Sequence, residues 1–126
     1  MTAPKLNTNN LMNAIRSIAT EYGARLFRNN VGRLQDRKGK YVNFGVCNPG
    51  GSDLIGWRPV TITQNMVGRK VAQFFAVEVK TGRDKLTQQQ KAFGDKVTLD
   101  GGLFIEARSV EDVLGKITNE VNDEKR

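Results

Sequence analysis

The stretch Phe74-Phe75-Ala76-Val77-Glu78-Val79-Lys80-Thr81 decides how the fold of this chain is interpreted. β-Branched and aromatic residues dominate it, which is typical of a β-strand. Strand side chains alternate between two faces. The face that we predict to be buried carries Phe75, Val77 and Val79. Glu78 and Lys80 then stand together on the other face, where a charged pair beside an apolar strand is costly and indicates a function.

A second carboxylate lies upstream, in Gly50-Gly51-Ser52-Asp53-Leu54-Ile55-Gly56. Glycines just before Asp53 let the backbone come close to a ligand. An Asp at the start of a strand, followed later by Glu-x-Lys within a strand, is typical of a metal site. The two acids are therefore the first candidates for metal ligands.

The chain between the two acids predicts a hairpin. Residues 54–63 read as one strand, residues 64–68 as a turn, and residues 69–81 as the returning strand. This pairing places Glu78 opposite Asp53 to Ile55 when Pro59 introduces no bulge. We therefore expect the two carboxylates on neighbouring antiparallel strands.

Composition limits the chemistry. The chain of 126 residues suits one domain with its own core, and it contains no histidine. The missing histidine excludes Ser-His-Asp triads and most zinc sites. The net charge of +7 favours a polyanionic partner, although a merely basic soluble protein has the same composition.

Cysteine usage and hydropathy bear on location. The single cysteine, Cys47, excludes an internal disulfide and fits a reducing compartment. The chain has no apolar run long enough to span a bilayer, and its first ten residues lack a signal-peptide core. We expect no membrane partner and a cytoplasmic location, in a bacterium or a phage-infected host.

The remaining elements predict a single α/β domain over residues 1–126, in the order α-β-β-β-α-β-α, with a mixed central sheet flanked by helices. Loose ends are expected at about 1–8 and 122–126. Outside the hairpin, the first predicted helix is capped by Thr8, Asn9 or Asn10 and stopped by Gly23, and strands are predicted at 24–27, 41–46 and 103–107. A second helix is predicted at 87–99, with Phe93, Val97 and Ala92 facing inward. The last helix begins at a Ser109–Asp112 capping box and extends to Val121.

Residues 29–40 show little periodicity and read as a basic loop. Cations concentrate in and around it: Arg25, Arg28, Arg33, Arg37, Lys38 and Lys40. The loop is either simply solvated or a phosphate-contacting surface, since such contacts supply most nucleic-acid affinity. Arg83 and Lys85, in the turn after the Glu78 strand, are further candidate DNA contacts.

The acid-x-Lys motif is weak by itself, because Asp36-Arg37-Lys38 and Asp123-Glu124-Lys125 match it as well as Glu78-Val79-Lys80. Only the last has an apolar strand face behind it and an Asp predicted opposite. Ligands that are all oxygen favour Mg²⁺, with Mn²⁺ as the alternative. The competing interpretation is a structural salt bridge of Glu78 at a sheet edge.

The combination of Glu21, Gly51-Ser52-Asp53, Glu78-Val79-Lys80 and Gln90 resembles the PD-(D/E)xK nuclease superfamily, and within it the small stand-alone VRR-NUC members of phages and bacteria. The resemblance covers about residues 11–106, although no proline directly precedes Asp53. It implies a restriction-endonuclease-like core and a metal-dependent phosphodiesterase. It further implies a homodimer that acts on branched DNA such as Holliday junctions, in recombination or repair.

In this interpretation Asp53, Glu78 and the backbone carbonyl of Val79 hold one or two Mg²⁺ ions, which activate water and neutralise phosphate charge. Lys80 orients or deprotonates that water. Glu21 either holds a second metal or a metal-bound water, or is a solvated surface residue.

Gln90 has two competing interpretations. It is either a catalytic residue that contacts the nucleophile or the phosphate, or the third helical residue of a capping box with Thr87. Capping turns its side chain back toward the Thr87 amide, so we expect one role and not both.

The sequence thus predicts a Mg²⁺-dependent, structure-specific DNA endonuclease. Two alternatives remain at this stage. One is a basic DNA-binding accessory protein that does not cut, although such a protein has no need for Asp53, Glu78 and Lys80 together. The other is a nuclease acting on plain duplex, flap or RNA ends.

Overall fold

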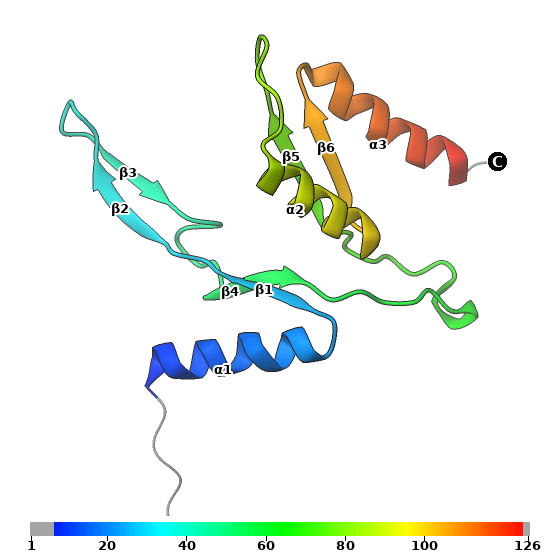
Figure 1. Ribbon diagram of the computed structural model, residues 1–126, viewed down its shortest axis with the longest axis horizontal. Helices are drawn as coiled ribbons and strands as arrows, with labels where there is room; N and C mark the ends of the chain where they lie inside the picture. Colours follow the sequence, from blue (N-terminus) through cyan, green and yellow to red (C-terminus); the bar gives the residue numbers. More distant parts are fainter. Residues whose placement is uncertain (1–6, 125–126) are drawn as a thin grey trace, which may run out of the picture. The chain divides into compact units, whose positions relative to one another are not determined.

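The protein is described by a computed structural model, which covers residues 7–124 and their side chains as far as Ile117. The chain forms two compact units, Met1–Val60 and Thr61–Arg126, and each is described by itself. The chain contains both helices and strands (Figure 1), in agreement with the predicted α/β class.

The first unit contains one helix and four strands: α1 (Thr8–Glu21), β1 (Arg25–Arg28), β2 (Gly32–Gln35), β3 (Tyr41–Phe44) and β4 (Leu54–Trp57). α1 packs against β1, and β1 pairs antiparallel with β4. Asn7 caps α1, since its Oδ1 accepts from the Asn10 backbone N–H at 2.8 Å. The cap thus lies one residue before the predicted candidates, and Thr8 is already helical.

The predicted basic loop at 29–40 is wrong in part, because β2 and β3 form an antiparallel hairpin there. Its turn is closed by Asp36, whose Oδ1 accepts from the backbone N–H groups of Lys38 and Lys40, both at 2.9 Å. An Asp that hydrogen-bonds its own turn stabilises a tight reversal. The two strands have only four residues each, too few for a clear periodic signal.

The second unit contains a short 3₁₀ turn, two strands and two helices: η1 (Gln64–Met66), β5 (Phe75–Val79), α2 (Gln88–Leu99), β6 (Leu103–Ala107) and α3 (Val110–Glu124). β5 and β6 are parallel and are joined through α2, which makes a βαβ unit. α2 and α3 both pack against β6. The most buried apolar side chains among the described residues are Val97, Ile105 and Ala107.

The predicted antiparallel hairpin between residues 54–63 and 69–81 is wrong. β4 pairs with β1, and β5 pairs with β6. Residues 58–63 form no strand, since Pro59 supplies no N–H to a ladder. Across residues 7–124 the strands form three two-stranded sheets and not one mixed central sheet. The helices and strands of these residues follow one another in the order α-β-β-β-β-β-α-β-α. The restriction-endonuclease-like core stays a prediction.

The predicted buried face of β5 is also wrong. Phe75, Val77 and Val79 are 43%, 39% and 68% exposed. Phe93 of α2 packs edge-on against Phe104 of β6, with ring centroids 6.2 Å apart, and Phe104 lies beside Ala76 in the register. The helix therefore covers the face that carries Ala76 and Glu78. Alternation was predicted correctly, but the choice of face depends on where α2 packs.

Several local predictions are confirmed. Thr87 caps α2, β6 spans Leu103–Ala107, and the Ser109 Oγ accepts from the Asp112 backbone N–H at 3.2 Å. Ala92 is exposed, contrary to expectation. α3 continues to Glu124, so the predicted loose end at 122–126 is wrong as far as residue 124, and residues 1–6 and 125–126 lie outside the described chain.

Between residues 7 and 124, no helix has the length and apolar character needed to cross a membrane.

The packing of α2 on β6 gives a stability prediction. A Cβ at Gly94 would lie 2.5 Å from a ring atom of Phe104, so we expect Gly94→Ala to destabilise the fold by about 1–3 kcal/mol. Gly115→Ala in α3 is the control, because a Cβ there meets no atom within 4 Å. It should stabilise its helix by up to about 1 kcal/mol. Urea unfolding measures both, and equal effects would contradict this packing.

Candidate functional site

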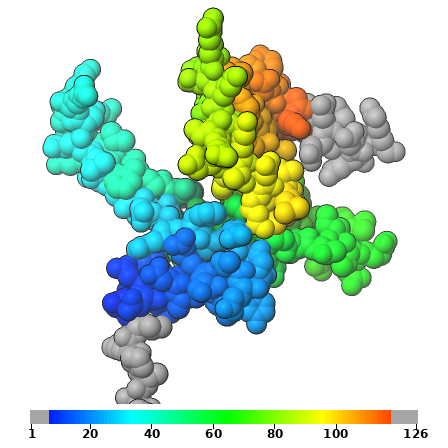
Figure 2. Space-filling view, viewed as in Figure 1, coloured from blue at the N-terminus to red at the C-terminus, as the bar shows by residue number. Residues whose placement is uncertain are grey.

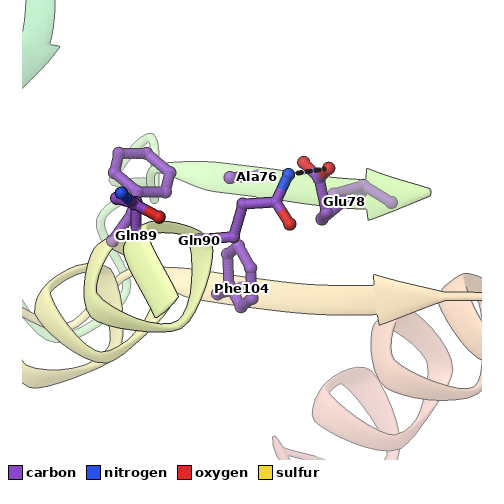
Figure 3. Close-up of a pocket in the computed structure, with 7 residues that line it drawn as sticks. Ala76, Glu78, Gln89, Gln90 and Phe104 are labelled. Carbon is purple, nitrogen blue, oxygen red and sulfur yellow. Dashed lines mark hydrogen bonds between the residues drawn. The ribbon is translucent and has the colours of Figure 1, made fainter. Parts of the chain in front are cut away.

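A pocket of about 260 Å³ opens between β5 and α2 in the second unit (Figure 3). Its lining residues are Ala76, Val77, Glu78, Gln89, Gln90, Phe93 and Phe104. Aromatic rings form one part of the wall, and the carboxylate of Glu78 and the amide of Gln90 form the polar part. The pocket therefore contains two of the sequence-predicted site residues.

Gln90 holds two partners at once. Its Oε1 accepts from the Thr87 backbone N–H at 2.9 Å, and Thr87 Oγ1 accepts from the Gln90 backbone N–H at 3.1 Å, which is a complete capping box. Its Nε2 donates to Glu78 Oε1 at 2.7 Å. A backbone N–H can only donate, so the cap fixes which amide atom faces Glu78. Capping therefore does not turn the Gln90 side chain away from Glu78, contrary to expectation, and the catalytic role of Gln90 stays a prediction.

Lys80, the residue directly after β5, completes the group. Its Nζ lies 3.8 Å from Glu78 Oε1, and the two side chains are 14% and 34% exposed. This distance exceeds that of a charge-assisted hydrogen bond, so the contact is electrostatic. Within the described residues both polar contacts of the Glu78 side chain go to Oε1, which leaves Oε2 able to bind a ligand. The salt-bridge interpretation is thus realised without occupying the whole carboxylate.

Asp53 and Glu21 belong to the first unit, and both are exposed. Asp53 comes directly before β4, and Glu21 is the last residue of α1. Neither unit gathers three Asp, Glu or Cys side chains into a metal-binding group among its described residues. The metal-ligand set of Asp53, Glu78, Glu21 and the Val79 carbonyl stays a prediction.

The structure requires glycine at position 51 for a reason that differs from the predicted approach of a ligand. A Cβ at this position would lie 2.0 Å from the carbonyl oxygen of Val46. Close approach of two backbone segments therefore requires glycine here, independently of any ligand.

Asn29 is a positioning residue that sequence reasoning missed. Its Nδ2 donates to the carbonyls of Val46 and Ser52 at 2.9 and 3.0 Å, and its Oδ1 accepts from the Val46 N–H at 2.8 Å. Its backbone N–H donates to the Asp53 carbonyl at 2.8 Å. Asn29 therefore fixes the backbone that carries Asp53. An Asn in an aperiodic polar stretch, beside Asn30, gave no signal that could single it out.

Arg108, just after β6, is a second residue that was missed. Its Nη1 donates to the Gly82 carbonyl at 2.9 Å, and its Nη2 donates to the Asp84 carbonyl and pairs with Glu106 Oε2 at 3.2 Å. It thereby ties the turn that carries Arg83 to the end of β6. The two contacts with the carbonyls of Gly82 and Asp84 span more than twenty residues, and no local sequence pattern predicts them.

The cations predicted to contact DNA are all exposed: Arg25, Arg28, Arg33, Arg37, Lys38, Arg83 and Lys85. Two of them have partners within the first unit. Arg28 Nη2 donates to Asn9 Oδ1 at 2.9 Å, and the Arg33 guanidinium lies 4.4 Å from the centre of the Tyr41 ring. Exposure is compatible with DNA contact, and the contact itself stays a prediction.

Comparison with known families finds a match to the VRR-NUC domain over residues 6–111. The match spans both units and includes every predicted site residue from Glu21 to Gln90. No curated protein and no solved structure matches the chain.

The double role of Gln90 predicts how three variants unfold. Thr87→Ala removes the cap hydroxyl and should lower the free energy of unfolding by about 0.5–2 kcal/mol. Gln90→Ala should lower it too, because it removes the other half of the box. Gln90→Glu keeps an oxygen for the Thr87 N–H and should be the least affected at that end of the helix. Thermal unfolding of the three variants measures these effects. A Gln90→Ala variant as stable as the parent would contradict the capping geometry.

Proposed function

The chain belongs to the VRR-NUC domain family, and on this basis we propose that it is a Mg²⁺-dependent, structure-specific DNA endonuclease. The family is one of nucleases, which hydrolyse phosphodiester bonds. We propose branched DNA, such as a Holliday junction, as the substrate. The observation that supports the proposal best is the group of Glu78, Lys80 and Gln90 at the helix-covered end of β5.

The donor set fits a hard divalent cation. Glu78 offers Oε2, because its in-chain contacts use Oε1. Oxygen ligands of this kind suit Mg²⁺ and, as the alternative, Mn²⁺. The further proposed ligands are Asp53 and the Val79 carbonyl, with Glu21 proposed for a second ion. A bound ion would supply activation of the attacking water and neutralisation of phosphate charge.

The described side chains define their own parts of the reaction. Lys80, whose side chain is only 14% exposed, offers its ammonium group toward oxygens that become more negative in the transition state, and it can orient the attacking water. Gln90 holds Glu78 Oε1 and so limits the rotamers of the carboxylate before substrate arrives. Gln90 thus acts through Glu78 as a positioning residue.

The proposed assembly follows from the substrate. Resolution of a symmetric junction requires two cuts, and two active sites related by a two-fold axis supply them. A homodimer is therefore proposed, with the exposed cations binding the DNA arms. The exposed thiol of Cys47 suits the proposed location in the reducing cytoplasm of a bacterium or a phage-infected host.

Cleavage is tested with labelled four-way junction, flap, duplex and single strand, each with Mg²⁺ and with chelator. The parent should cut the junction in Mg²⁺ only. Asp53→Ala and Glu78→Gln should abolish cleavage and leave junction binding nearly intact, because they remove ligands and not phosphate contacts. Cleavage by either variant at the parental rate would contradict the assignment. Binding without cleavage by the parent would favour the accessory-protein alternative.

Turnover separates the cap from the site at Gln90. Gln90→Glu keeps the capping oxygen but sets a second carboxylate against Glu78, so its turnover should fall. Gln90→Ala should lose about 10–100-fold, the usual effect of removing a group that orients a metal ligand. Thr87→Ala, measured below its unfolding temperature, should cut at the parental rate. Parental turnover in both Gln90 variants would make Gln90 a cap alone.

A further inference from the structure

We propose that the β2–β3 hairpin, residues Gly32–Phe44 and called here the arm, binds duplex DNA through one face and its tip. The proposal rests on the proposed function only in taking DNA as the partner. In the first unit the arm is a narrow two-stranded ribbon, drawn in cyan in Figures 1 and 2. A ribbon of two strands fits the major groove of B-DNA.

The register divides the arm into two faces. Residues that pair across the ribbon point to the same side. The polar face carries the pairs Arg33↔Asn43 and Gln35↔Tyr41, and the other face carries Gly32↔Phe44 and Leu34↔Val42. Every side chain of the polar face can therefore hydrogen-bond or carries a positive charge, and all four are exposed.

Arg33 is held in place on this face. Its guanidinium lies 4.4 Å from the centre of the Tyr41 ring, the diagonal neighbour on the facing strand. A guanidinium that lies against an aromatic ring in this way keeps N–H groups that can still donate to a ligand. A stacked arginine loses less freedom when it binds, and its edge matches phosphate or guanine acceptors.

The tip carries the remaining charge. Arg37, Lys38 and Lys40 are exposed there, and the Asp36 carboxylate accepts two backbone N–H bonds within the turn. The arm has four cations against one carboxylate, so its net charge is +3. This fixed turn presents its cations to a polyanion, which supports DNA as the occupant.

The root of the arm connects it to Asp53. Asn48 Nδ2 donates to the carbonyls of Gly32 and Phe44 at 2.8 and 3.0 Å, which closes the base of the ribbon. Asn29 then ties Val46, just beyond the arm, to the residue before Asp53. Contacts of the arm with a duplex would thus bear on the segment that carries a proposed metal ligand.

The test is the salt dependence of DNA binding by the full chain, without divalent ions, using a labelled duplex and a labelled four-way junction. Arg37→Gln with Lys38→Gln removes two arm cations. If each contacts a phosphate, the slope of log K against log salt should decrease by about 0.9 per contact, or about 1.8 in all. Lys91→Gln with Lys116→Gln, two exposed helix cations, is the control of equal charge and should leave the slope unchanged.

A second pair of variants tests the stacked arginine. Tyr41→Ala should weaken duplex binding several-fold, while Tyr41→Phe keeps the ring and should bind like the parent. Circular dichroism of each variant checks that the fold persists, and Leu34→Thr on the other face should bind duplex like the parent. Equal slopes for the arm and control doubles, or parental binding by folded Tyr41→Ala, would overturn the proposal.

The readout is independent of cleavage. If the arm variants behave as expected in a protein that cuts no substrate, the proposed endonuclease activity is contradicted and DNA binding by the arm is supported. If the parent cuts junctions but the arm variants bind DNA with the parental salt slope, DNA binding by the arm is contradicted and the endonuclease activity is supported. Displacement of bound duplex by polyglutamate at equal charge concentration would indicate a surface for acidic protein, and would also overturn the proposal.

Discussion

The hydrogen bond from Gln90 Nε2 to Glu78 Oε1, 2.7 Å long, is the contact on which the second unit's site depends. It joins the first turn of α2 to the next-to-last residue of β5, and the capping box with Thr87 fixes the orientation of the amide that makes it. The position of the helix follows from Phe93 against Phe104 and from the absence of a side chain at Gly94. A packing arrangement and a helix cap thus set the direction of one proposed metal ligand.

In the first unit, the segment that carries Asp53 is held in a similar way. The side-chain amide of Asn29 hydrogen-bonds the backbone on both sides of the turn before Asp53. The backbone N–H of Asn29 donates to the Asp53 carbonyl. In each unit an amide side chain fixes the surroundings of a carboxylate. Amides suit this task because they carry both a donor and an acceptor and remain neutral beside a charge.

What the sequence could predict depended on the range of the interactions involved. The start of α2 at Thr87 and the extent of β6 follow from neighbouring residues, and both predictions were confirmed. The partner of β5 depends on β6, on the far side of α2, and the prediction of an antiparallel partner failed. The covered face of β5 was reversed for the same reason, since alternation is local but the position of a helix is not. The β2–β3 hairpin was missed because its strands are short and its turn is held by one Asp side chain.

We propose that binding of a divalent ion requires the carboxylates of both Asp53 and Glu78. Calorimetric titration of Mn²⁺ into the parent, Asp53→Asn, Glu78→Gln and the double variant tests it most directly. If both carboxylates are required, each single variant should lose the bound ion, and the double variant should lose nothing further, because coupled ligands are not additive. Additive losses from two independent sites, or parental Mn²⁺ binding in either single variant, would contradict a joint role of the two carboxylates.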